Sequence, residues 1–239
     1  VRRTSFSSAL LPQWGLRYSV LKSNMKFLAD KAVLTRAVYT KRQLNRVVEE
    51  FDLLIVGSDE VWSCKKKRPF DSSYFLNFPN FEGRKASYAA SAGVTESYKR
   101  LTSSVYRFLS SYSGVSVRDE NTDRLVRTAG VNVVRSMDPT FLVDIDSKDL
   151  PCEIASSPYI LTYLYKPEND TADLHKLKNK LSAKLVSFDI KLKETDIYYL
   201  YMKASQFPAV VEQAKLVVTD SFHGMVFALK HNVPLAIIL

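Results

Sequence analysis

Glycine is scarce in this sequence, with 7 residues among 239. The chain contains no Gly-x-Gly-x-x-Gly segment and no P-loop, so a glycine-rich phosphate cradle is nearly excluded. A bound phosphate would instead have to be held by helix amino termini and basic side chains.

Cysteine is scarcer still, with Cys64 and Cys152 far apart in the sequence. They form no CxxC pair and no Cys/His cluster with metal-ligand spacing, so we predict no metal site. Two reduced thiols are typical of a cytoplasmic protein. No apolar stretch approaches the roughly 20 residues that span a bilayer, and no signal peptide is visible.

The charge is unbalanced, with a formal net charge of +9. A basic surface attracts phosphates, nucleic acid or anionic lipid. The densest cluster is Lys65–Arg68, which is ordinarily a solvated loop, and no recognisable nucleic-acid module accompanies it. We therefore predict no nucleic-acid partner, and keep peripheral contact with an anionic membrane surface as a hypothesis.

Short apolar runs alternate with segments of helical periodicity along the whole chain, which predicts an α/β fold built on parallel sheets. Strands are expected at 53–56, 86–91, 115–117, 131–134, 159–164, 185–188, 216–219 and 234–239. Helices are expected within 16–50 and at 95–111, 121–128, 170–182, 207–214 and 225–230. Glu120 or Asn121 is expected to cap the helix at 121–128.

Residues 144–158 are polar and hold two prolines, so they are the candidate linker. We predict an N-terminal α/β domain at 1–150 and a C-terminal one at 151–239. The chain starts without methionine and stops in an apparent strand, which predicts a fragment that lacks both ends of its fold.

Polar residues that follow strands are the first candidates for a ligand site, because parallel sheets bind ligands beyond the carboxyl ends of their strands. After the strand at 53–56 come Ser58 and Asp59, which either bind a ligand or cap the next element. After 86–91, the small residues around Ser91 and Gly93 either leave room for a ligand or allow tight helix packing.

Two further strand ends carry the residues best suited to chemistry. Arg118 follows a buried strand, so it should pair with Asp119, with a neighbouring carboxylate or with an anionic ligand. His223 begins a helix after the strand at 216–219, where it could exchange protons with a substrate or be merely structural. Its neighbours Asp220, Ser221 and Gly224 complete the candidate binding residues.

Five stretches in this order resemble the polysaccharide pyruvyl transferase family. They are Gly57-Ser58-Asp59-Glu60-Val61-Trp62, Ser87-Tyr88-Ala89-Ala90-Ser91-Ala92-Gly93, Ser116-Val117-Arg118-Asp119, Asp138-Pro139-Thr140-Phe141-Leu142 and Thr219-Asp220-Ser221-Phe222-His223-Gly224. Each stretch is weak alone, but the ordered set over most of the chain is specific.

The resemblance implies two Rossmann-like halves of GT-B type, with the active site between them. It implies phosphoenolpyruvate as donor, no cofactor, and as acceptor a sugar or lipid-linked glycan of a cell-surface polysaccharide, converted into a pyruvate ketal. It implies that Arg118 holds the donor's phosphate or carboxylate and that His223 is the general acid or base. Asp59, Asp220 and Ser221 would orient sugar hydroxyls. The cytoplasm, near the inner face of the membrane, is the expected location.

Two alternatives stay open. One is a GT-B glycosyltransferase with a nucleotide-sugar donor, which would also use basic groups at the donor phosphates. The other is a non-catalytic sugar-binding protein of the same fold.

Overall fold

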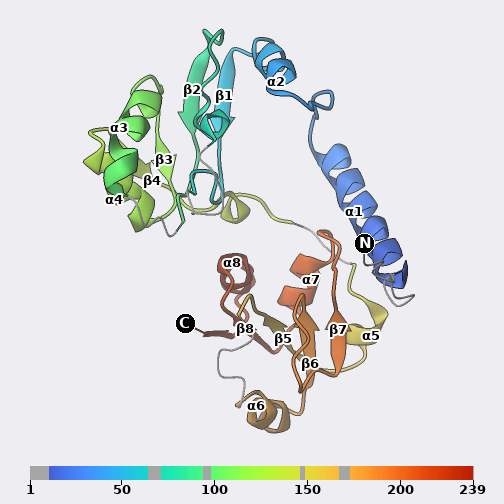
Figure 1. Ribbon diagram of the computed structural model, residues 1–239. Helices are drawn as coiled ribbons and strands as arrows, with labels where there is room; N and C mark the ends of the chain where they lie inside the picture. The colour runs from blue at the N-terminus through green and yellow to red at the C-terminus, as the bar shows by residue number, and fades with distance from the viewer. Residues whose placement is uncertain (1–10, 64–70, 94–97, 146–148, 167–172, 239) are drawn as a thin grey trace, which may run out of the picture. The chain divides into compact units, whose positions relative to one another are not determined.

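The structure, a computed structural model, describes residues 11–63, 71–93, 98–145, 149–166 and 173–238 (Figure 1). Its contacts divide the chain into two compact units. The middle unit comprises Thr35–Val143, and the terminal unit comprises Asp144–Leu239 together with Val1–Leu34. The domain boundary near residue 150 stays a prediction. Cys64 and the basic cluster Lys65–Arg68 lie outside the described residues.

Short parallel strands form the centre of the middle unit. β1 (Leu53–Val56) pairs with β2 (Arg84–Ser87), and β3 (Ser116–Val117) pairs with β4 (Val134–Arg135). Single parallel bridges join the chain around β2 to the chain around β3. The carboxyl ends of β1, β2 and β3 therefore meet at one edge, where ligands of parallel sheets bind.

The helices of the middle unit are α2 (Lys41–Val48), α3 (Tyr98–Leu109) and α4 (Glu120–Thr128). Thr40 and Gln43 form a capping box at the start of α2, in which each side chain accepts from the other residue's backbone N–H. The cap of α4 is Asp119, whose carboxylate accepts from the backbone N–H of Thr122 at 2.8 Å. The prediction that Glu120 or Asn121 caps this helix was wrong by one residue.

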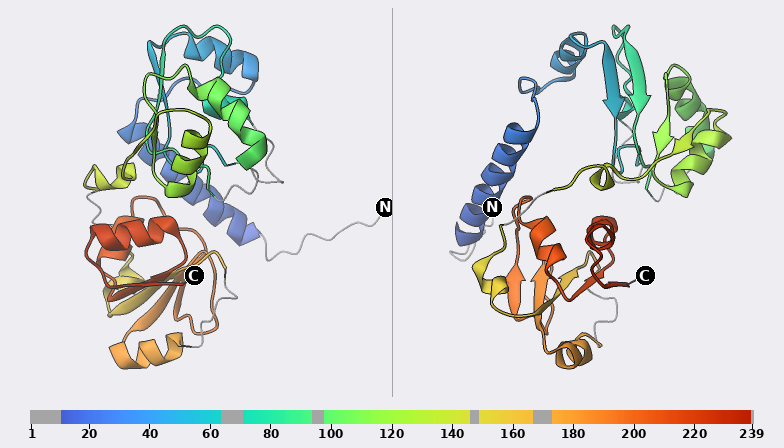
Figure 2. Two further views of the ribbon diagram at one scale, coloured as in Figure 1. Left: turned by 90° about the vertical axis from the view of Figure 1, so that its left-hand side faces the viewer. Right: turned by 180° about the vertical axis from the view of Figure 1, so that it is seen from behind.

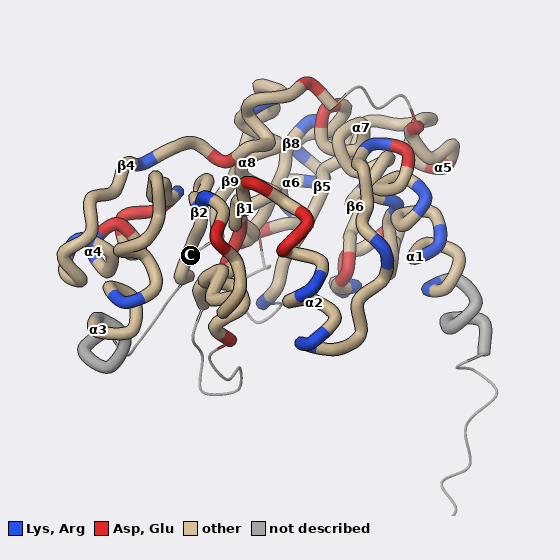
Figure 3. Tube along the Cα trace, turned by 90° about the horizontal axis from the view of Figure 1, so that it is seen from above, with Lys and Arg blue, Asp and Glu red and all other residues tan. Residues whose placement is uncertain are grey.

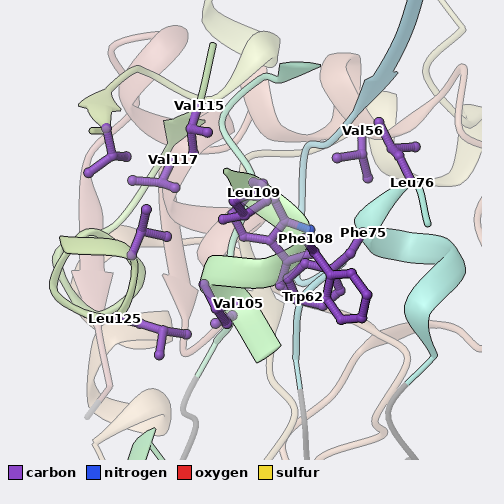
Figure 4. Packing of buried hydrophobic residues seen from close by; sticks show 14 of the residues in the cluster. Val56, Trp62, Phe75, Leu76, Val105, Phe108, Leu109, Val115, Val117 and Leu125 are labelled. Carbon is purple, nitrogen blue, oxygen red and sulfur yellow. The ribbon is translucent and has the colours of Figure 1, made fainter. Parts of the chain in front are cut away.

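Buried aromatic and aliphatic side chains fill the core of the middle unit (Figure 4). The Trp62 and Phe75 rings stack with centroids 5.3 Å apart, and Phe75 packs on Phe108 of α3. The indole N–H of Trp62 donates to the carbonyl of Tyr74, so its polar atom is satisfied. This core supports the loop that leaves β1.

The terminal unit has a five-stranded parallel sheet in the order β7-β6-β5-β8-β9. Its strands are β5 (Tyr159–Tyr163), β6 (Lys184–Phe188), β7 (Ile197–Tyr199), β8 (Leu216–Thr219) and β9 (Leu235–Ile237). The chain order reverses between β5 and β8, the position at which open α/β sheets form a ligand crevice. The helices are α1 (Leu11–Lys31), α5 (Cys152–Ala155), α6 (Leu174–Leu181), α7 (Phe207–Glu212) and α8 (Phe222–Lys230).

Successive residues of the central strands face opposite sides of this sheet. Leu161 of β5 packs in the cluster with α7 and α8, whereas Ile160 packs in the cluster with α6. Val217 and Val218 of β8 divide in the same way. Figure 2 shows the helices on both sides of the sheet. Because both faces are covered, the strands are continuous apolar runs, as the sequence indicated.

The predicted α/β class with parallel sheets is confirmed. The sequence did not predict β7, and the expected linker contains α5. Basic and acidic residues are interspersed over both units (Figure 3). Among the described residues, no helix combines the length and apolar character needed to cross a membrane.

Candidate functional site

Arg118 lies directly after β3, and its side chain is 7% exposed. One terminal nitrogen donates to Asp138 at 2.9 Å, and the other donates to Asp59 at 2.8 Å. Asp119 is used as the cap of α4. The sequence left three possible partners for Arg118: Asp119, another carboxylate or an anionic ligand. The structure shows two other carboxylates, both distant in the chain.

Backbone geometry brings Asp59 to Arg118. Gly57 has φ +128°, and a Cβ there would lie 2.0 Å from the carbonyl oxygen of Tyr88, so only glycine allows this approach. Asp59 itself has φ +67°, in the left-handed region that aspartate tolerates. Ser58 between them is half-buried. The candidate residues after β1 therefore lie at the same sheet edge as Arg118.

Ser91 and Gly93 belong to the neighbouring strand exit and have structural contacts. Ser91 is 2% exposed, and its hydroxyl accepts from the backbone N–H of Gly93 at 2.9 Å. Gly93 has φ +58°, and a Cβ there would lie 2.6 Å from the Glu60 carboxylate. The Gly93 carbonyl accepts from the side-chain amide of Asn121. These contacts favour tight packing, the second of the two interpretations offered by the sequence.

The immediate surroundings of Arg118 are electrostatically satisfied. Two carboxylates face one guanidinium, so the three groups together carry one negative charge. The Asp138 carboxylate is 1% exposed and also accepts from the backbone N–H and hydroxyl of Thr140. An anionic ligand at this arginine would therefore compete with a carboxylate.

In the terminal unit, hydrogen bonds connect the residues at the carboxyl ends of β5 and β8. Both oxygens of Asp220 accept backbone N–H groups, from Tyr165 at 2.7 Å and from Lys166 at 2.9 Å. The hydroxyl of Thr219 donates to the carbonyl of Tyr163 at 2.5 Å. Asp220 therefore fixes the loop that follows β5, at the point where strand order reverses.

His223 is in the first turn of α8 and is half-buried. Ser221 is the N-cap of this helix, and its hydroxyl accepts from the backbone N–H of Gly224 at 3.4 Å. Gly224 is buried, and a Cβ there would lie 2.4 Å from the hydroxyl of Thr219. Glycine thus lets the helix start pack on the end of β8, next to which His223 lies in the chain.

Aromatic side chains surround this strand exit. The Tyr163 and Tyr165 hydroxyls are 2.8 Å apart, and the Tyr163 ring packs on Phe188 and Phe207. Burial, followed by the hydrogen bond to Tyr165, raises the pKa of Tyr163 above its ordinary value, so this phenol stays protonated. Tyr165 as a whole residue is 56% exposed.

The predicted site residues thus form two groups. Ser58, Asp59, Ser91, Gly93 and Arg118 lie at one edge of the middle unit, and Asp220, Ser221, His223 and Gly224 lie directly after β8, beside β5, in the terminal unit. Sequence reasoning quoted Asp138 only as part of a family-like stretch and gave no role to Asp138, Tyr163 or Tyr165. The available signal for the two tyrosines was their position at and just after the end of an apolar strand.

Other surface features add little to these two groups. Three hollows, lined by residues such as Arg84, Gly114 and Lys184, lie at the amino ends of strands, the opposite side from where parallel sheets bind ligands. Within the described part of the chain, no three His, Cys, Asp or Glu side chains gather as they would around a metal ion.

These observations define an α/β protein with two candidate sites at strand ends, one that contains an arginine and one that contains a histidine. A family model described as polysaccharide pyruvyl transferase matches residues 5–239. The chain therefore belongs to the polysaccharide pyruvyl transferase family, which classes it as a transferase.

Comparison with curated proteins gave no match. Among solved structures, UDP-N-acetylglucosamine 2-epimerase from Rickettsia bellii is similar, with 11% identity and a TM-score of 0.48. The match covers 81% of this chain and 58% of the epimerase chain.

Proposed function

We propose that this protein transfers a pyruvyl group from phosphoenolpyruvate to a sugar of a cell-surface polysaccharide or its lipid-linked precursor, forming a ketal. The match to the family over residues 5–239 carries this proposal. The two units would be the halves of a GT-B type enzyme, and no cofactor beyond the donor substrate is invoked.

The proposed reaction balances without an oxidant or reductant. A proton adds to the methylene carbon of phosphoenolpyruvate, and the central carbon becomes cationic. One sugar hydroxyl forms a C–O bond to that carbon and releases its proton. A second hydroxyl of the same sugar then displaces inorganic phosphate, which leaves with the remaining proton.

His223 is the residue proposed to deliver or relay the first proton. An imidazole exchanges protons near neutral pH, which suits general acid and base catalysis. Its place in the first turn of α8 supports this role, because the free N–H groups of a helix start favour an anionic substrate nearby.

Arg118 is proposed to hold the donor's phosphate or carboxylate and to stabilise departing phosphate. Ser58 at the same sheet edge, and Ser221 next to His223, are proposed to contact substrate, while Asp59 is paired with Arg118. Asp220 would act indirectly, since its two oxygens hold the loop that carries Tyr165. The exposed Tyr165 ring is suited to packing against the apolar face of a sugar.

We place the reaction in the cytoplasm, at the inner membrane face where lipid-linked precursors lie. The formal net charge of +9 supports contact with anionic lipid. Co-sedimentation with phosphatidylserine vesicles at low salt should be seen and should fall when Lys65–Arg68 are neutralised. Absence of co-sedimentation would contradict this location.

The reaction is tested by incubating protein, phosphoenolpyruvate and hexose glycosides in deuterium oxide. Pyruvyl transfer predicts release of phosphate and a ketal methyl group that carries one deuterium, which NMR detects. His223→Ala should abolish both signals, and His175→Ala, at an exposed histidine of α6, should not. Transfer from a nucleotide sugar instead would favour the glycosyltransferase alternative. Sugar binding that survives His223→Ala, without turnover by the parent, would favour the non-catalytic alternative.

A further inference from the structure

The two carboxylates on Arg118 are not equivalent. Asp138 is 1% exposed and Asp59 is 64% exposed, although their distances to the guanidinium are nearly the same, 2.9 and 2.8 Å. Asp138 also accepts two hydrogen bonds from Thr140. Removal of Asp138 would thus take away the buried partner of a buried guanidinium and the acceptor of two Thr140 hydrogen bonds, whereas removal of Asp59 would leave that guanidinium paired with its buried partner Asp138.

We propose that Asp59 is a displaceable counterion, which occupies the place on Arg118 that the donor's anionic group takes on binding. This inference rests on the proposed function and identifies Asp59 as a residue that lowers the affinity for the donor. Asp138 is then the permanent partner that orients the guanidinium. A carboxylate or phosphate of the donor would accept from the same terminal nitrogen in place of the Asp59 carboxylate, so the arginine keeps a second anionic partner throughout.

The local geometry allows this exchange without unfolding the loop. The carbonyl of Asp59 accepts from the backbone N–H groups of Val61 at 2.8 Å and Ser91 at 2.9 Å, so the backbone is fastened independently of the carboxylate. The bridge between Asp59 and Ala90 fixes the same residue in the sheet. Displacement therefore requires only a side-chain rotation into solvent, which an exposed aspartate makes on a fast timescale.

The sign of the effect follows from charge. While Asp59 is on Arg118, it competes with the ligand, and after displacement it still repels the ligand's negative charge. Asp59→Asn removes the repulsion and weakens the competition, since a neutral amide oxygen pairs less strongly with the guanidinium, and it should tighten binding about two- to fivefold, the range expected of a largely exposed ion pair. The gain should shrink at high salt, because exposed charges are screened.

The test is calorimetric titration of phosphoenolpyruvate, inorganic phosphate and pyruvate into the parent protein and into Asp59→Asn. Phosphate and pyruvate each carry one of the two anionic groups of the donor. The affinity that rises in Asp59→Asn therefore identifies the group that binds Arg118. Asp173→Asn is the matched control, because its carboxylate is 73% exposed and pairs with Lys176. This control changes net charge equally and should leave every affinity unchanged. Asp138→Asn should weaken binding, the opposite sign to Asp59→Asn.

Tighter binding in Asp59→Asn with an unchanged control supports the proposal. Equal or weaker binding in Asp59→Asn, with clear binding by the parent, would overturn it and make Asp59 a positioning or substrate-contacting residue. Equal gains in Asp59→Asn and Asp173→Asn would also overturn it, since net charge alone would then explain them. Failure of the parent and Asp59→Asn to bind any of the three anions would instead remove the donor site, and the proposed function with it.

Discussion

Replacing Asp138 with alanine should destabilise the middle unit strongly. The Asp138 and Arg118 side chains are 1% and 7% exposed, so the variant leaves a buried guanidinium without its most buried partner. Breaking a buried ion pair by removing one partner costs about 3–5 kcal/mol. Thr140 also loses the acceptor of its backbone N–H and hydroxyl.

Urea unfolding followed by tryptophan fluorescence measures this effect, because Trp62 is 2% exposed in the core of the same unit. Glu120→Ala is the control, since its ion pair with Arg124 is 71–72% exposed and should contribute less than about 1 kcal/mol. The double variant Arg118→Met, Asp138→Asn should regain much of the loss, because it removes the buried charge together with its buried partner. A cost for Asp138→Ala no larger than that of the control would refute this reasoning.

Three further predictions concern the terminal unit. Burial alone would raise the pKa of Asp196, but the Lys178 ion pair at 2.6 Å and a backbone hydrogen bond lower it overall. The ionised Asp196 should therefore stabilise the fold at pH values above its pKa in the unfolded chain, near 3.8, and this contribution should be lost as pH falls through the lower pKa of the folded state. Asp196→Asn should cost less than about 1 kcal/mol of unfolding free energy in urea titrations at neutral pH and nothing in strong acid. Gly224→Ala should lower stability by about 1–3 kcal/mol, because the added methyl would meet the Thr219 hydroxyl; an unchanged melting curve would contradict the packing role. Asp220→Asn should destabilise by about 1–3 kcal/mol and speed hydrogen exchange of the two amides after β5, since one carboxylate oxygen becomes a donor facing an N–H; unchanged exchange would show that the carboxylate does not hold this loop.

The positions of the functional strand ends were largely predictable from sequence. β1 and β8 are short apolar runs followed by polar residues. In β8 the run is continuous because a parallel strand covered on both faces needs no alternation, whereas Leu53 and Ile55 of β1 are exposed. β7 was missed because it is a three-residue edge strand whose residues are only half-buried. The length and burial that produce a sequence signal are both lacking there.

The partners of the site residues were less predictable. The sequence indicated that Arg118 needs a carboxylate, but the two observed carboxylates lie 59 and 20 residues away in the chain. Pairing at such separations depends on strand order, which local patterns do not encode. The adjacent Asp119 was unavailable because a helix start takes its carboxylate.

The most direct test of the central claim is calorimetric titration of phosphoenolpyruvate and of uridine diphosphate into the protein and into Arg118→Gln, with folding checked by circular dichroism. The account predicts that the parent binds phosphoenolpyruvate but not the nucleotide, and that a folded Arg118→Gln loses this binding. Binding of the nucleotide without binding of phosphoenolpyruvate would contradict pyruvyl transfer and favour glycosyl transfer.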